Sequence, residues 1–136
     1  PIVNANVSYI ASYKAIRLAL VDLQRKMAET DSVIMDGRDI GTYVLPKAEV
    51  KIFQIASVET RAQRRFKENQ KKGIECTIED IREDVKKRDY IDSHRAFAPL
   101  QPAEDSISLD TSDMSIEEVV DVILKIIDEK IKELSK

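Results

Sequence analysis

Apolar residues recur every three or four positions in some stretches of the chain and stand in short uninterrupted runs in others. The first spacing is typical of helices that bury one face, and the second is typical of strands. Helices are therefore predicted at about 9–29, 57–73, 77–95 and 115–131, and strands at 32–36, 50–56 and 106–110. Strands that alternate with amphipathic helices in this way indicate an α/β domain with a parallel sheet.

Several boundaries carry local signals. Ser57 is placed to cap the second helix, which we expect to stop at Gly73. The segments 77–80 and 115–118 read as capping boxes that open the next two helices. The stretch 96–105 contains two prolines and is expected to be extended.

Composition narrows the class of protein. The 136 residues are 43% hydrophobic and 35% charged, as expected of a globular protein with a core, and we expect a soluble, cytoplasmic one without membrane contact. The net charge of −3 argues against nucleic acid as a partner. Cys76 is the single cysteine, so a disulfide framework is excluded, and with one histidine a Cys/His metal site is not expected.

The candidate chemistry begins with the run Asp36-Gly37-Arg38-Asp39, directly after the apolar residues 33–35. Ligands bind at the carboxyl ends of parallel strands in open α/β sheets. Arg38 could fork onto a phosphate or form a structural ion pair with Asp36 or Asp39. Asp39 could accept a hydrogen bond from an amino group of a ligand, whereas Asp36 alone could simply form a turn.

Two further groups of charged residues share helical faces. Arg88, Asp92 and Arg95 are four and three positions apart, which suits either ligand binding or a self-satisfied surface ladder. Arg64 and Arg65 lie with Arg61 on one side of the preceding helix. They could belong to a ligand site, or they could simply form a solvated basic face of the helix.

The two runs, Gly-Arg-Asp-Ile-Gly-Thr from residue 37 and Arg-Asp-x-x-Asp-x-x-Arg from residue 88, occur in an order that closely resembles the bacterial cytidylate (CMP) kinases. The resemblance covers essentially the whole chain. No Gly-x-x-x-x-Gly-Lys-[Ser/Thr] loop for ATP phosphates occurs in it. Residues 1–136 are therefore interpreted as the C-terminal part of a single nucleoside monophosphate kinase domain, with a short lid-like helical region at about 58–95. The implied fold is a three-layer, P-loop kinase-type parallel sheet flanked by helices, present only in part.

The resemblance also implies roles for individual residues. On the acceptor side, Ser8, Arg17 and Asp39 would read the cytosine base. Arg88 and Asp92 would hold the ribose hydroxyls, and Arg38 and Arg95 would bind the CMP phosphate. On the donor side, Arg64 and Arg65 would be lid arginines that neutralise the transferring phosphoryl group. Asp36 would be the acid that supports the metal, and Asp110 with Thr111 would form a loop near the ATP adenine.

The implied activity is transfer of the ATP γ-phosphoryl group to CMP or dCMP, with Mg²⁺ bridging phosphates and ATP as co-substrate. We expect this chain alone to be inactive. We also expect it to be unstable, unless it self-associates through exposed sheet edges or recruits an N-terminal segment. Alternatives are a non-catalytic nucleotide-binding or regulatory module without a phosphate loop, and a structural or interaction domain, which would not explain the ordered pair of motifs.

Overall fold

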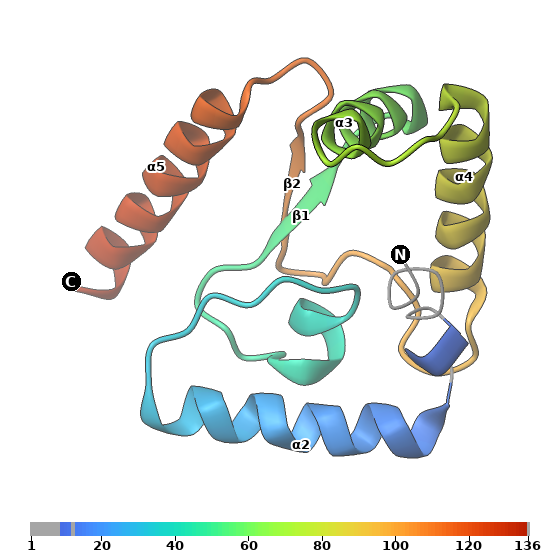
Figure 1. Ribbon diagram of the computed structural model, residues 1–136. Coiled ribbons are helices and arrows are strands. Elements are labelled where there is room, and N and C mark those ends of the chain that lie inside the picture. Colours follow the sequence, from blue (N-terminus) through green and yellow to red (C-terminus); the bar gives the residue numbers. More distant parts are fainter. Residues whose placement is uncertain (1–8, 12, 136) are drawn as a thin grey trace. The chain divides into compact units, whose positions relative to one another are not determined.

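The computed structural model describes residues 9–11 and 13–135, and its helices and strands are drawn in Figure 1. They are α2 (Lys14–Thr30), the π-helical turn η1 (Ile40–Val44), β1 (Ile52–Ile55), α3 (Val58–Lys71), α4 (Ile78–His94), β2 (Ile107–Asp110) and α5 (Ile116–Leu134). The chain divides into two compact units. The first comprises the described residues up to 47 together with 87–103, and the second comprises 48–86 together with the described residues from 104 onward.

The second unit contains a parallel pair of strands. β1 pairs with β2 in a register that places Ile52 opposite Ile107 and Ile55 opposite Asp110. A parallel pair requires a long crossover connection, and here α3 and α4 lie between the two strands in the sequence. The predicted strands at 50–56 and 106–110 are confirmed, with slightly shorter bounds.

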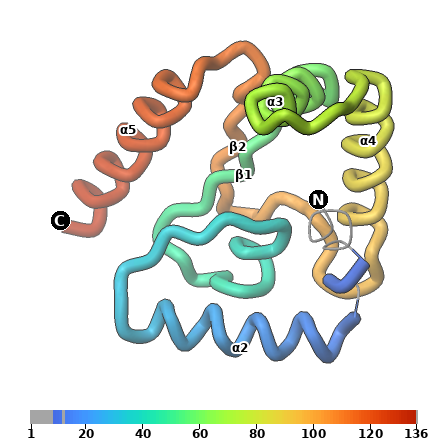
Figure 2. Tube along the Cα trace, viewed as in Figure 1, coloured from blue at the N-terminus to red at the C-terminus, as the bar shows by residue number. Residues whose placement is uncertain are grey.

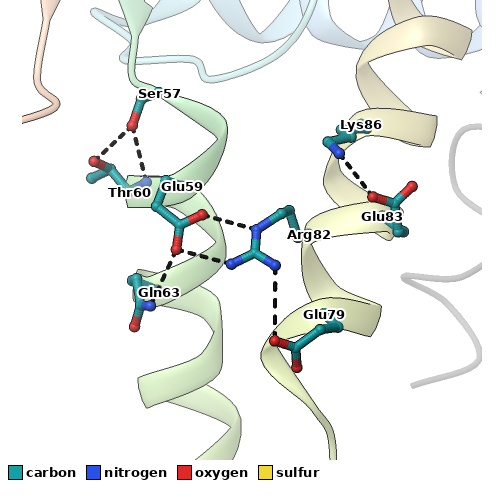
Figure 3. Close-up of polar contacts among 8 residues, drawn as sticks. All are labelled: Ser57, Glu59, Thr60, Gln63, Glu79, Arg82, Glu83 and Lys86. Carbon is teal, nitrogen blue, oxygen red and sulfur yellow. Dashed lines mark hydrogen bonds and ion pairs between the residues drawn. The ribbon is translucent and has the colours of Figure 1, made fainter.

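The helices α3 and α4 enclose the hydrophobic cluster of the second unit. Ala62 of α3 is buried with Ile81 and Val85 of α4, and Phe66 and Ile78 pack against them. Figure 3 shows the polar contact beside this cluster, in which the Arg82 guanidinium forks onto the Glu59 carboxylate at 2.8 and 3.2 Å. The hydrogen bonds from Arg82 hold the pKa of Glu59 below its usual value.

The predicted helix boundaries are set by local hydrogen bonds. The Ser57 side chain accepts from the Thr60 backbone N–H at 3.0 Å, and Gly73 adopts a φ of +66° just beyond α3, a conformation that favours glycine. Thr77 Oγ1 accepts from the Asp80 N–H at 3.1 Å. Ser115 and Glu118 form the complete capping box that opens α5.

Two predicted elements differ. The prediction of a strand at 32–36 is wrong, because this segment forms no strand with any of the described residues and leaves Ile34 97% exposed. Strand formation depends on a neighbour that the apolar run itself does not specify. The helix expected from residue 9 is interrupted at Tyr13, whose ψ of 111° is extended. The apolar spacing continues across this break and therefore gave no sign of it.

In the first unit, α2 and η1 lie beside each other, as Figures 1 and 2 show. Val21 of α2 and Val44 of η1 are both buried. The Tyr43 ring meets the Phe97 ring edge-on at 4.9 Å between centroids, which connects η1 to the segment after α4. Among the described residues, no helix is both long enough and apolar enough to cross a membrane.

Candidate functional site: an arginine-rich cavity

A cavity of about 250 Å³ lies in the first unit. Its walls come from α2, from the turn at 36–40, and from the C-terminal half of α4 with Arg95 directly after it. Seven residues predicted from the sequence meet there, from three segments far apart in the chain: Arg17, Asp36, Arg38, Asp39, Arg88, Asp92 and Arg95. The structure therefore brings the two sequence motifs to one place.

Asp39 is one of two buried carboxylates in this wall and is 3% exposed. Arg17 Nη2 donates to its Oδ2 atom. Arg95 Nη2 lies 3.6 Å from its Oδ1 atom. Both guanidiniums are themselves largely buried, so solvent screens these pairs little.

Asp92 is the second buried carboxylate and is also 3% exposed. Its Oδ2 atom accepts from Arg38 Nε at 2.9 Å and lies 3.6 Å from Arg88 Nε. Arg38 therefore pairs with Asp92, not with Asp36 or Asp39. Because Asp92 is buried, its ion pairs do not form a surface ladder.

The cavity carries an excess of positive charge. Four arginines face two buried carboxylates, which leaves two positive charges, or one when the exposed Asp36 is included. Burial lowers the pKa of the Arg95 guanidinium and Asp39 opposes that effect. Arg17 Nε and Arg95 Nη2 are buried and find no hydrogen-bond acceptor among the described residues. Buried donors in this condition call for an acceptor, and an anion supplies one best.

Asp36 is the residue that the family resemblance assigned to the metal. The described residues hold no cluster of three or more His, Cys, Asp or Glu side chains. Mg²⁺ in nucleotide sites commonly uses one or two carboxylates together with substrate phosphates and water. The exposed Asp36 carboxylate on the cavity wall fits that donor set.

Sequence reasoning missed Gln24. It lines the cavity from α2, and its Oε1 atom is buried without a donor among the described residues. Gln24 stands seven positions after Arg17, which places both on one face of the helix. That spacing was the available signal, but a polar residue in a helix reads first as solvated.

The remaining predicted residues lie elsewhere. Arg64 of α3 donates from Nη2 to the carbonyls of Thr111 and Met114, and its Nη1 lies 3.3 Å from Thr111 Oγ1. Arg65 adds to the positive charge that lowers the pKa of Glu68, to which Lys72 contributes most.

The loop after β2 is held by its own side chains. Thr111 is fully buried, and its hydroxyl donates to the Ile55 carbonyl at 3.2 Å. Asp110 accepts from the hydroxyl and backbone N–H of Ser112, which lowers the pKa of Asp110. The predicted base contact Ser8 lies outside the described residues.

A parallel strand pair with helices and an arginine-rich cavity defines an α/β protein equipped to bind an anionic ligand. Comparison with known proteins is more specific, because the family described as cytidylate kinase matches residues 1–129. The chain belongs to the cytidylate kinase family. That family implies a P-loop kinase fold, and the small parallel sheet with its helices is consistent with part of it.

Curated relatives agree with this assignment. The chain is 52% identical over 130 residues to a cytidylate kinase of Anoxybacillus flavithermus, covering 96% of this chain and 58% of that protein. It is 54% identical over 132 residues to one of Lactobacillus johnsonii, covering 97% of this chain and 57% of that protein. The chain thus spans somewhat more than half the length of these relatives.

Proposed function

We propose that the protein transfers the γ-phosphoryl group of ATP to CMP or dCMP, and that this chain supplies the site for the acceptor nucleotide. The proposal is based on one structural observation. Four arginines converge on two buried carboxylates in a single cavity and leave buried N–H donors unused. A nucleoside monophosphate offers a phosphate for the surplus positive charge, and a base and sugar for the carboxylates.

Cytosine recognition would rest on Arg17 and Asp39. The cytosine edge presents an amino donor beside ring acceptors, so a carboxylate and a guanidinium side by side have the right polarity. The ion pair between Arg17 and Asp39 already holds these two groups together. Uracil presents a carbonyl where cytosine has its amino group, and the carboxylate would repel it.

The sugar and phosphate would be bound through the second buried carboxylate and its neighbours. Asp92, with Arg88, would take the sugar hydroxyls, and Arg38 and Arg95 would bind the phosphate. Arg38 pairs with Asp92 in the structure described here. The pair would keep both side chains near their working positions, so that little ordering is needed when a nucleotide enters.

Phosphoryl transfer depends mainly on positioning and on neutralising charge. We assign Arg64 and Arg65 to the transferring group, and Asp110 and Thr111 to the ATP side. Arg64 would first have to release the carbonyls of Thr111 and Met114 that it now binds. Asp36 would support Mg²⁺, which when bound neutralises phosphate charge.

The test uses protein expressed from the complete reading frame, assayed for nucleotide-dependent ADP formation from Mg-ATP. We expect turnover with CMP and dCMP well above that with UMP and AMP. Asp39→Ala should lower the preference for CMP over UMP. Asp84→Asn, which alters an exposed carboxylate on α4, is the matched control and should leave the preference unchanged. Equal turnover with UMP, or none with CMP, would refute the proposal.

The 136-residue chain is assayed in parallel, with its mass verified. We expect no turnover from it, because its sequence has no Gly-Lys-[Ser/Thr] phosphate loop. CMP-selective turnover by the chain itself would show that this expectation is wrong.

A further inference from the structure

Arg25 of α2 binds the end of the turn that follows Asp39. Its Nε atom donates to the Val44 carbonyl at 2.9 Å, and its Nη2 atom donates to the Tyr43 carbonyl at 2.7 Å. The guanidinium also lies 5.6 Å from the centroid of the Tyr43 ring. The last carbonyls of a helical turn have no partner within the turn, and a planar guanidinium can satisfy two neighbouring ones at once.

The other end of the same turn is Asp39. The backbone N–H groups of Tyr43 and Val44 both donate to the Asp39 carbonyl, at 2.9 and 3.1 Å. Val44 therefore accepts from Arg25 through its carbonyl and donates to Asp39 through its amide. Val44 is buried, which excludes water from competing for these bonds.

These hydrogen bonds connect η1 to α2 at both ends of the turn. Arg17 holds the Asp39 carboxylate, and Arg25, eight residues later, holds the far end of η1. Eight residues of helix span about 12 Å, so α2 fixes the turn at two separated points. Without Arg25, the hydrogen bond from Arg17 to Asp39 is the one that remains between an α2 side chain and the turn among the described residues.

We propose that Arg25 is a positioning residue that sets the location of the Asp39 carboxylate through η1, and thereby the selectivity for cytosine. The inference rests on the proposed function, since it needs Asp39 to read the base. Arg25 is not among the residues that line the cavity. π-Helical turns are frequent at functional sites, and here the irregular turn places a carboxylate in the cavity wall.

The experiment compares Arg25→Gln and Arg25→Lys with Lys26→Gln, in protein expressed from the complete reading frame. Lys26 is the neighbouring exposed cation on α2, so its loss changes charge equally without touching η1. Steady-state kinetics are measured with CMP, UMP and ATP. Amide hydrogen exchange at Val44 is measured in the same proteins.

Arg25→Gln should lower kcat/KM for CMP by about tenfold, because a displacement of about 1 Å can cost up to ~100-fold. The preference for CMP over UMP should fall with it, while KM for ATP stays constant. Exchange at Val44 should quicken. Arg25→Lys, which keeps the charge and one hydrogen bond, should recover part of the preference. Lys26→Gln should match the unsubstituted protein.

A purely structural role would lower the amount of folded protein without changing the CMP/UMP ratio, and that result overturns the proposal. If Arg25→Gln does not fold, Arg25→Lys provides the test. An unchanged CMP/UMP ratio in Arg25→Lys would then overturn the proposal. If the unsubstituted protein shows no CMP-dependent turnover, the proposed function fails and the positioning role fails with it. Selective turnover that survives loss of Arg25 refutes the positioning role alone.

Discussion

Asp39→Asn isolates the charge of the buried carboxylate while nearly preserving its shape. In the structure this carboxylate faces the guanidiniums of Arg17 and Arg95, whose side chains are 11% and 6% exposed. Removing one partner of a buried ion pair typically costs about 3 kcal/mol or more, because a desolvated charge stays behind. Here two guanidiniums would lose their counter-charge. We therefore expect the free energy of unfolding to fall by about 3 kcal/mol.

Urea unfolding of protein from the complete reading frame measures this loss. With an m-value of about 2 kcal/mol per molar, the midpoint should move down by about 1.5 M. Asp84→Asn, on an exposed face of α4, is the control and should change stability by less than about 0.5 kcal/mol. A double-mutant cycle with Arg17→Met then separates the pairwise energy, expected at about 1–3 kcal/mol.

The reasoning is refuted if Asp39→Asn behaves like the control with an unchanged m-value. It is also refuted if the Arg17 and Asp39 substitutions are additive, because groups in direct contact should couple. Either result would mean that the buried carboxylate does not depend on its arginine neighbours.

Three further outcomes are expected. Ser115→Ala should lower the free energy of unfolding by about 1 kcal/mol, as measured by urea unfolding, because it removes the cap of α5; no change would show that α5 does not unfold with the rest. The hydrogen bond from Lys51 lowers the pKa of Asp105 below its ordinary value of 3.8, so this pair stabilises the fold above pH 3.8 and the contribution is lost as pH falls through the lower, folded-state pKa. An NMR titration of Asp105 in the protein and in Lys51→Met checks this, and equal pKa values would contradict it. Asp92→Asn should raise KM for CMP by about tenfold and KM for dCMP by less, because a charged acceptor for the sugar hydroxyls is lost. Steady-state kinetics measure both values, and an equal rise for the two nucleotides would show that Asp92 does not bind the 2′-hydroxyl.

Local signals were enough for most of the secondary structure. Ser57 and Ser115 cap their helices as the sequence indicated, because an N-cap bond reaches only three residues along the chain. The segment 32–36 shows the limit of such reasoning. Its apolar residues suit a strand, but pairing depends on a partner that local sequence does not reveal.

The same distinction separates what could be predicted of the cavity from what could not. The charged residues of the two motifs could be assigned to one site, but their pairing could not: Arg38 meets Asp92 across 54 positions. Arg25 and Gln24 escaped notice because the amphipathic spacing of a helix identifies its apolar residues and leaves its polar ones looking alike. Only the three-dimensional arrangement shows that one of them holds a turn and the other lines the cavity.

Both compact units are assembled from two separated stretches of chain, and this affects how the protein is made. The chain enters the first unit, leaves it after residue 47, returns at 87 and departs again after 103. Neither unit can therefore be isolated by a single cut. During synthesis, β1 must wait until β2 has been added 55 positions later before the two strands can pair, whereas the α3–α4 cluster is complete much earlier. Contacts so distant in sequence form slowly, so the helical pair is expected to act as the early structure around which the parallel strands close.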